Sequence, residues 1–475
     1  MAQSIARTAT LSSDNTDKLI RKIAWVIALG VLLNPLNSSM IAVALLRIGN
    51  EFQVNVATVT WLISGFYLAG AIGPSLAGKL SDLFGAKKLF AIGLLLVVIS
   101  SLFAAWAPNF GTLLTLRIVQ ALGSTVAFPA GMSILRSVTV QHDPKQGSNG
   151  IASALGLISI TANVMAAFGP TLGGFLVGYV SWYAIFWINI PIAIVVLLFV
   201  RLWLPADRMK QPEHSGSAIP AQSIWKRIDI LGIILFTIML TTVMLFLLSL
   251  SNGMYWWLLI IAAISAISLV RWEHRASSPF LNIQMLSSNR RLLSVFLQFA
   301  GVNIVFYALF FCMPLWLDQV KGFDPKTTGL LMLPFAGLGV IMTPIAVRMN
   351  KRYGYRTTII AGNVVLILGT VLLLFLGDKS SIPIILMVTA ALGIPNGLNN
   401  MGLQTALYHV TQPEETGIAS GLFQTFRSIG SILSTSLLGL IFGSNVTSSG
   451  LHTIALITSG LGVVLLLISS SRQLK

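Results

Sequence analysis

The feature that most constrains this chain is a succession of fourteen long apolar segments. A helix of roughly 20 apolar residues crosses a hydrocarbon core of roughly 30 Å. Helices are required there because lipid offers the backbone no hydrogen-bond partner. Only 9% of the residues are charged, against roughly 25% in soluble proteins. The sequence therefore predicts an all-α integral membrane protein with fourteen transmembrane helices.

The predicted spans follow one another along the whole chain, and Ser251-Asn252-Gly253 is the turn signal that separates the seventh from the eighth. They are residues 23–45, 58–80, 88–106, 111–135, 148–177, 182–202, 229–249, 254–272, 292–317, 326–348, 357–376, 382–409, 416–443 and 450–470.

Basic residues orient these spans, because loops on the cytoplasmic side of a membrane collect Lys and Arg. With the N-terminus inside, the cytoplasmic segments hold 24 of the 30 basic residues, the outer loops hold 4 and the spans hold 2. A span count wrong by one would scramble this asymmetry. We therefore expect a multi-pass protein of the inner (cytoplasmic) cell membrane with both termini in the cytoplasm.

The hydrophilic segments are short. Residues 1–22 are interpreted as a cytoplasmic tail and residues 203–228 as a cytoplasmic linker, too short for a folded domain. The net charge of +16 would suggest nucleic acid as a partner in a soluble protein. Here the basic residues follow the loops, so we expect the lipid bilayer and a small molecule as partners, and no nucleic acid.

The loop after the second span carries the sequence GKLSDLFGAKK at residues 78–88. Gly78 allows close helix contact, and Gly85 can take a positive φ in a tight turn. Asp82 can pair with Lys87, Lys88 or a helix N-terminus. These residues predict a conformational latch that holds one state and breaks in the other. The alternative is an ordinary basic cytoplasmic loop.

Two later spans carry further patterns. In span 4, Arg117 and Gln120 lie one helical turn apart, on the same face, and an arginine at that depth needs a partner or a water-filled cavity. In span 5, GPTLGG at 169–174 contains three glycines that let helices approach, and Pro170 permits a bend. The alternative for span 5, taken alone, is a glycine-rich packing helix.

The order and spacing of these patterns, with SWYAIFWINIP at 181–191, resemble the fourteen-helix drug:proton antiporter branch of the major facilitator superfamily. The resemblance implies two six-helix bundles, residues 23–202 and 273–475, with two inserted helices at 229–272. It also implies alternating access around a central cavity and proton-coupled, multidrug-efflux-like export of small organic molecules.

The chain departs from that branch in its first span, where Asn37 stands at the position of an aspartate. An amide takes up no proton near neutral pH. The fourteen acidic residues all lie in tails, loops or span ends, and Asp318 is the possible proton site. Two interpretations follow: coupling through Asp318 or an unusual site, or altered coupling with an anionic substrate attracted by Arg117 and Arg427.

The candidate cavity residues are mostly amides, joined by two arginines and two aromatic residues. They are Asn34, Asn37, Tyr67, Arg117, Gln120, Asn163, Asn303, Phe306, Asn396, Asn399, Asn400, Gln404 and Arg427. Of the four amides in span 12, at least two are expected to face the cavity. The exporter-motif residues are Gly169, Pro170, Gly173 and Gly174.

Three functional hypotheses follow: a secondary exporter of small organic molecules, an exporter or facilitator of an anionic metabolite such as an organic acid or siderophore, and a membrane enzyme or sensor. The last would need a soluble domain or a His, Cys or carboxylate cluster at an interface, and the sequence has neither, so we expect no enzyme. It also has no G-x-x-x-x-G-K-[ST] motif for ATP. We expect a monomer with no metal or cofactor, driven by a proton gradient.

Overall fold

The computed structural model describes residues 19–142, 147–205, 229–249, 254–276, 279, 289–411, 416–443 and 445–471. Within these ranges the secondary structure is helical and contains no strand. Fourteen helical segments are long and apolar enough to cross a membrane, which confirms the predicted number of spans. Their bounds agree with the predicted ones within a few residues, except that the apolar part of span 5 is Ile160–Tyr179. The predicted boundary segments 1–18 and 206–228 lie outside the described residues.

The first six spans pack together, and several consist of two shorter helices. The first of these spans begins with a helical segment at 19–31. Their elements are α2 (Leu33–Met40), η1 (Ile41–Val43), α3 (Leu45–Glu51), α4 (Val56–Val59), α5 (Trp61–Phe84), α6 (Ala86–Ala104), α7 (Phe110–Thr125), α8 (Ala127–His142), α9 (Gly147–Tyr179), α10 (Ala184–Trp187) and α11 (Asn189–Trp203).

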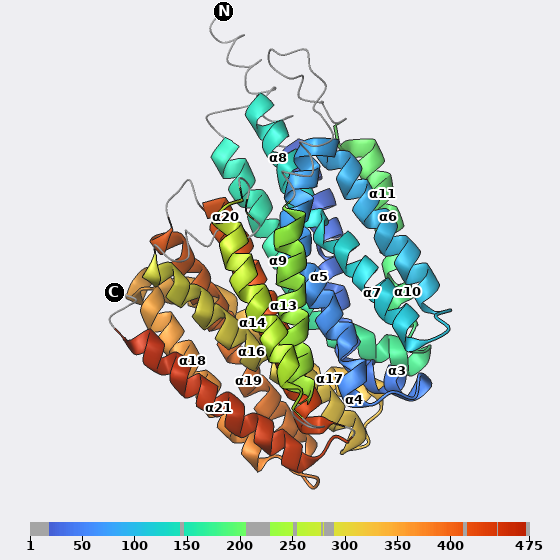
Figure 1. Ribbon diagram of the computed structural model, residues 1–475, viewed down its shortest axis with the longest axis vertical. Coiled ribbons are helices and arrows are strands. Elements are labelled where there is room, and N and C mark those ends of the chain that lie inside the picture. The colour runs from blue at the N-terminus through green and yellow to red at the C-terminus, as the bar shows by residue number, and fades with distance from the viewer. Residues whose placement is uncertain are drawn as a thin grey trace, which may run out of the picture.

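The last six spans form a second group, beside the first in Figure 1. Their elements are α16 (Arg290–Gln319), α17 (Pro325–Tyr353), α18 (Tyr355–Leu372), η2 (Leu373–Phe375), α19 (Ile382–Val410), α20 (Thr416–Phe442) and α21 (Ser448–Ser470). We call the two groups the N-terminal and C-terminal bundles. The most extensive contacts between them are those of α9 with α17 and of α5 with α20.

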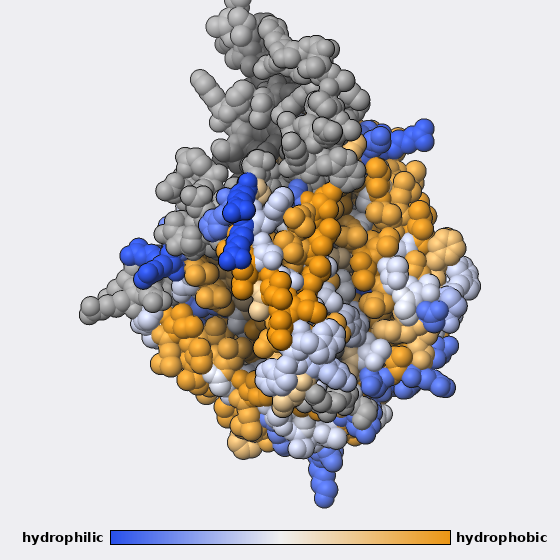
Figure 2. All heavy atoms as spheres, viewed as in Figure 1, coloured by the Kyte–Doolittle hydropathy of each residue, from blue (hydrophilic) through white to orange (hydrophobic). Residues whose placement is uncertain are grey.

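Two further helices, α13 (Ile230–Ser249) and α14 (Trp256–Glu273), lie in front of the line where the bundles meet (Figure 1). α13 packs against α20 of one bundle and α5 of the other, whereas α14 packs mainly on α13. Residues Ile260, Ile264 and Ile267 on α14 are more than half exposed. Figure 2 shows hydrophobic residues over most of this flank, as expected for a surface that faces lipid.

The bundles touch at one end of the molecule, here called the closed end. Arg47 on α3 and Asp318 on α16 form an ion pair with an N–O distance of 3.6 Å. The hydroxyls of Ser64 and Thr435 lie 2.6 Å apart, and the backbone N–H of Ala57 donates to the carbonyl of Gly443. These bonds fasten the N-terminal bundle to the C-terminal bundle on the α5–α20 side.

The opposite end is here called the terminal end because residues 19 and 471 lie there. A Cβ atom built on Gly78, Gly337 or Gly421 would meet nothing within 4 Å among the described residues. These glycines lie on α5, α17 and α20, which are the helices that touch at the closed end. Among the described residues, the hydrogen bonds and the ion pair between the bundles therefore gather toward the closed end.

Candidate functional site

A cluster from both bundles lies where the bundles begin to separate. The ring centroids of Tyr67 on α5 and Tyr307 on α16 are 4.9 Å apart. Arg427 on α20 donates from Nε to the hydroxyl of Tyr307 over 2.9 Å. Both tyrosines are buried, whereas Arg427 is partly exposed. The cluster joins the bundles and places a cation at the point from which they diverge.

Arg117 lies inside the N-terminal bundle and is 1% exposed. Its Nη1 donates to Gln120 over 2.6 Å, and its Nη2 donates to the backbone carbonyl of Asn37 over 2.7 Å. The guanidinium carbon lies 4.3 Å from the ring centroid of Phe66. Its Nε has no hydrogen-bond partner among the described residues. In this conformation the Arg117 side chain bridges helices, so its predicted place in the cavity lining stays a prediction.

Asn37 and Gln120 extend this network to two more helices. The amides of Asn37 on α2 and Asn189 on α11 exchange two hydrogen bonds of 2.8 Å. Gln120 donates to the hydroxyl of Ser101 on α6 over 2.8 Å. All four side chains are at most 2% exposed. A buried polar network that satisfies nearly all its members fixes the relative positions of its helices.

The glycines of the exporter motif lie on two faces of α9. A Cβ atom on Gly173 would lie 2.8 Å from the carbonyl oxygen of Met40, and one on Gly169 would clash with Ser39. These two residues allow α9 to pack against α2 within the N-terminal bundle. Gly174 points the other way, since its Cβ would lie 2.4 Å from the carbonyl oxygen of Pro325 on α17.

The same stretch of α9 therefore joins the bundles. The hydroxyl of Thr171 donates to the carbonyl of Gly329 over 2.9 Å. A Cβ on Gly329 would in turn lie 2.6 Å from the carbonyl oxygen of Pro170. At the end of α9, Lys326 donates to the hydroxyl of Tyr179 over 2.7 Å. The α9–α17 contact completes the seal on the side opposite α5 and α20.

This arrangement agrees with comparisons to known proteins. The family model described as Major Facilitator Superfamily matches residues 27–435. The chain belongs to the Major Facilitator Superfamily. It is therefore a multi-pass membrane transporter.

The relatives and structural neighbours of this facilitator are transporters too. The chain is 38% identical to "Uncharacterized MFS-type transporter YwoD" of Bacillus subtilis (strain 168), over 89% of this chain and 90% of the relative. It is 26% identical to "Multidrug resistance protein Stp" of Mycobacterium tuberculosis (strain CDC 1551 / Oshkosh), over 90% and 77%. The crystal structure of the nucleoside transporter NupG matches with a TM-score of 0.59 and 15% identity, over 95% of this chain and 98% of that one. The likeness to NupG shows the fold alone.

The remaining predicted amides of this facilitator take several positions. Asn34 is partly exposed and donates to Ser124, whereas Asn303 is buried and donates to the carbonyl of Phe299 on its own helix. The side chain of Asn163 lies outside the described residues. These positions leave the predicted cavity roles of the three amides untested.

Span 12 shows a division among its four amides. Asn396, Asn400 and Gln404 recur every four residues on α19 and are partly exposed, and Asn400 hydrogen-bonds to Asn396. Asn399 is 0% exposed, its side-chain atoms have no partner among the described residues, and it presses against Gly362 of α18. Three of the four amides therefore share one accessible side of α19.

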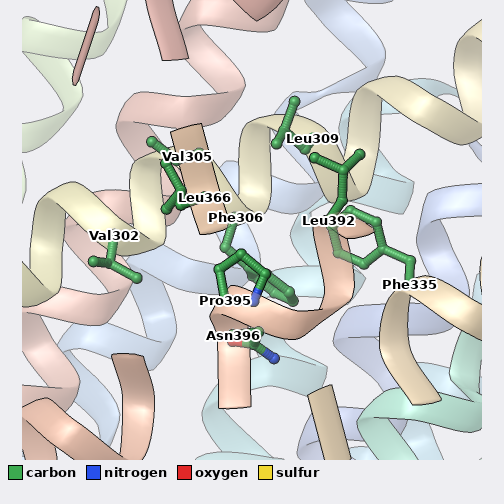
Figure 3. A pocket seen from close by; sticks show the side chains of 9 residues that line it. All are labelled: Val302, Val305, Phe306, Leu309, Phe335, Leu366, Leu392, Pro395 and Asn396. Carbon is green, nitrogen blue, oxygen red and sulfur yellow. The ribbon is translucent and has the colours of Figure 1, made fainter. Parts of the chain in front are cut away.

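A small space lies inside the C-terminal bundle rather than between the bundles. Figure 3 shows its lining, which comes from α16, α17, α18 and α19 and includes the predicted cavity residues Phe306 and Asn396. The cavity volume is about 10 Å³, at the lower limit for one water molecule. This space is too small to hold a transported molecule.

The latch motif forms the turn between α5 and α6. Gly85 has a φ of 93°, a value that favours glycine. Lys87 donates to the backbone carbonyl of Leu204 over 2.5 Å, and Lys88 is exposed. Gly354, with a φ of 82°, forms the equivalent turn between α17 and α18. The side chain of Asp82 lies outside the described residues, so the latch itself stays a prediction.

Two residues of this site were missed by the sequence analysis. Asn189, the partner of Asn37, stands in the quoted segment at 181–191, and its position two residues before Pro191 in that segment was the available signal. Arg47, the partner of Asp318, was counted only as a basic residue of an outer loop. Opposite charges at the ends of two spans were the signal for that pair.

Proposed function

We propose that this facilitator is a secondary active exporter of small organic molecules that works by alternating access. The observation that carries the proposal is the asymmetric contact between the bundles, whose described bonds mostly lie between the Arg47–Asp318 pair and the Tyr67–Tyr307 contact. With the predicted cytoplasmic termini, the closed end faces outward, and the terminal end, where an exporter loads its cargo, faces the cytoplasm. The Stp relative is named for multidrug resistance, and export of small organic molecules is one way to produce resistance.

Rocking of the bundles would break the closed-end bonds and bring the separated ends together. The described side-chain bonds to be broken include the Arg47–Asp318 ion pair, the Ser64–Thr435 pair and the Lys326–Tyr179 bond. The Thr171–Gly329 and Ala57–Gly443 hydrogen bonds would break with them. Each contributes on the order of 1 kcal/mol or less in such settings. Binding of a substrate near Tyr67 and Arg427 can therefore shift the balance between the two states.

The proposed energy source is the proton gradient, and Asp318 is the proposed proton site. Its carboxylate is bound to Arg47 across the bundle interface. Protonation would remove the charge that holds this pair, so a proton entering from the closed end would favour opening there. Proton uptake and opening of the closed end would then both depend on the Arg47–Asp318 ion pair.

Arg427 favours a second candidate, an exporter of an anionic metabolite with altered coupling. Its guanidinium is partly exposed where the bundles diverge, and no carboxylate hydrogen-bonds to it among the described residues. A cation in that setting attracts a carboxylate or phosphate.

Transport by purified protein in proteoliposomes tests both candidates. The cargoes are a cationic dye and an organic acid, each measured with and without a pH gradient. Uptake of the cation into inside-out vesicles, lost on adding a protonophore, supports the first candidate. Gradient-independent transport of the acid, lost in Arg427→Gln and kept in Arg427→Lys, supports the second. Transport of neither cargo class in either direction would refute the proposed function.

A further inference from the structure

The Arg427 side chain is held at one of its three nitrogen atoms and leaves the other two available. Its Nε donates to the hydroxyl of Tyr307 over 2.9 Å, whereas Nη1 and Nη2 make no hydrogen bond among the described residues. Neither Nη group is among the buried polar atoms that lack a partner, and the residue is partly exposed. The two Nη groups therefore form an accessible pair of donors.

A pair of donors held in this way matches an organic carboxylate. The planar guanidinium can bind both carboxylate oxygens at once when its N–H groups point in the right direction. A lysine ammonium attracts an anion as a point charge, without this geometric match. The described hydrogen bonds and ion pairs give Arg427 no carboxylate of the protein. A carboxylate partner would therefore come from the cargo.

Tyr307 is itself fixed by packing and can therefore set the direction of the guanidinium. It is 4% exposed. On its own helix, α16, its ring meets Phe306 edge to face with centroids 5.1 Å apart and stacks on Phe311 at 5.7 Å. The guanidinium carbon of Arg427 lies 5.9 Å from the centroid of the same ring. Holding Nε in advance reduces the rotamer freedom that the arginine would lose on binding an anion.

The other bundle also packs against the Tyr307 ring. The ring centroid of Tyr67 on α5 lies 4.9 Å from that of Tyr307. One turn away from Tyr67 in each direction, the hydroxyl of Ser64 and the carbonyl oxygen of Ala71 lie 2.6 Å and 3.4 Å from hydroxyls of α20. The position of Tyr67 against Tyr307 therefore depends on the contact between α5 and α20.

We propose, on the basis of the second candidate function above, that Tyr307 is a positioning residue that aims the Nη groups of Arg427 at an organic carboxylate, and that Tyr67 links this aim to the closed-end contact. While the bundles touch at the closed end, Tyr67 packs on Tyr307 and Tyr307 holds Nε. When the bundles rock and the closed end opens, Tyr67 moves away with its own bundle. Arg427 then loses its orientation, so the carboxylate is bound tightly in one state and released in the other.

Equilibrium binding of two fluorescent probes to the purified full-length transporter tests the role of Tyr307. The probes are naphthoate and naphthamide, which have the same ring system and differ in charge. The wild type should prefer the acid. Tyr307→Phe keeps the ring and removes the hydroxyl, so it should weaken binding of the acid roughly tenfold, the lower end of the range for a hydrogen bond to a charged group. Binding of the amide should not change.

A double-mutant cycle with Arg427→Lys separates positioning from packing. The lysine keeps the positive charge but has neither the Nε that Tyr307 holds nor a pair of Nη groups. Arg427→Lys alone should weaken binding of the acid, and adding Tyr307→Phe should weaken it no further. Equal losses from Tyr307→Phe in the two backgrounds, or equal losses for the acid and the amide, would overturn the role of Tyr307. If Tyr307→Phe does not fold, unchanged acid binding in Arg427→Lys would refute the bidentate site.

Two variants of Tyr67 test the link to the other bundle. Tyr67→Phe keeps the ring that packs on Tyr307, whereas Tyr67→Leu removes it. Tyr67→Leu should therefore weaken binding of the acid severalfold more than Tyr67→Phe does, and it should do so only for the acid. Equal acid binding in the two variants would refute the link. Equal losses of acid and amide in Tyr67→Leu would also refute it, since Tyr67 would then act only by direct contact with the probe.

Failure of this carboxylate site and failure of the proposed function give different results. A wild type that does not prefer naphthoate would overturn the carboxylate site, even if proteoliposomes transport another cargo. Lack of transport of every cargo class would overturn the proposed function, even if the purified protein binds naphthoate through Arg427.

Discussion

The side-chain amides of Asn37 and Asn189 face each other inside the N-terminal bundle and exchange two hydrogen bonds of 2.8 Å. Asn37 also donates to the carbonyl of Leu33, and Asn189 donates to two carbonyls on its own side. The backbone of Asn37 binds the guanidinium of Arg117. An amide at position 37 therefore matches its surroundings, with a donor facing acceptors and an acceptor facing a donor.

The substitution Asn37→Asp should make transport more dependent on pH. One oxygen of the new carboxyl would still accept from Asn189, while the other would face the carbonyl of Leu33 and the amide oxygen of Asn189. A protonated carboxyl suits that second position because its O–H can donate, whereas the nearby charge of Arg117 favours the ionised form. The carboxyl group at position 37 would therefore take up or release a proton when its distance from Arg117 or Asn189 changes during the transport cycle. Initial transport rates in proteoliposomes across a range of pH would reveal the effect.

Asn363→Asp is the matched control for that substitution. Asn363 is 0% exposed in the C-terminal bundle and donates to the hydroxyl of Ser469, and no described hydrogen bond joins it to an arginine. We expect its pH profile to follow the wild type. If Asn37→Asp has the wild-type profile as well, the amide at position 37 is not the reason for altered coupling.

The Arg47–Asp318 ion pair should bias the molecule toward its closed-end contact. Arg47→Gln should lower the population of that state by up to about fivefold, because a partly exposed pair contributes at most about 1 kcal/mol. Spin labels at Glu51 and Lys379, exposed residues near the closed end of the two bundles, would report the population as a distance distribution. The background is Cys312→Ser, which removes the single buried cysteine.

Asp318→Asn separates gating from proton transfer. Both Arg47→Gln and Asp318→Asn remove the ion pair, but only the second removes the carboxyl group. If Asp318 carries the proton, gradient-driven transport should be lost in Asp318→Asn and retained in Arg47→Gln. Equal retention in both variants would exclude Asp318 as the proton site, and equal distance distributions in wild type and Arg47→Gln would exclude the gate.

The spans could be predicted from sequence because apolar length is a local property of the chain. The turn at Gly85 was also predictable, because a positive φ depends on the residue type at a single position. The partners of Asn37 and Asp318 were not, because Asn189 and Arg47 are distant in sequence. Their pairing depends on the rotation of each helix about its axis, which packing of the whole bundle decides.

Arg117 shows, in a single residue, what could and could not be predicted from the sequence. Its depth in span 4 and its position beside Gln120 followed from sequence. Whether its guanidinium faced a cavity or a neighbouring helix depended on where the backbone of Asn37 lay. In the described conformation that carbonyl accepts from Nη2 at 2.7 Å, and the Arg117 side chain lies in the bundle interior.

Gly174 on α9 should be far less tolerant of alanine than Gly178, one turn further along the same helix. A Cβ on Gly174 would lie 2.4 Å from the carbonyl oxygen of Pro325, whereas one on Gly178 would lie 3.4 Å from its nearest neighbour, Lys326. Gly174→Ala should therefore force α9 and α17 apart and reduce transport, while Gly178→Ala should behave as wild type. Transport assays of both variants at equal expression would test this, and equal activities would exclude the α9–α17 contact as part of the seal.

The two glycines of the latch motif should respond differently to alanine. Gly85→Ala forces a side chain into a φ of 93°, which costs about 1–3 kcal/mol, so the melting temperature of the purified protein should fall. Gly78→Ala should leave it unchanged, because the new methyl group meets no atom of the described residues within 4 Å. If the latch closes when the terminal ends of the bundles approach, Gly78→Ala should nevertheless slow transport, since the methyl group would then meet a facing helix. Wild-type transport by Gly78→Ala would show that no close helix contact forms at this position during the cycle.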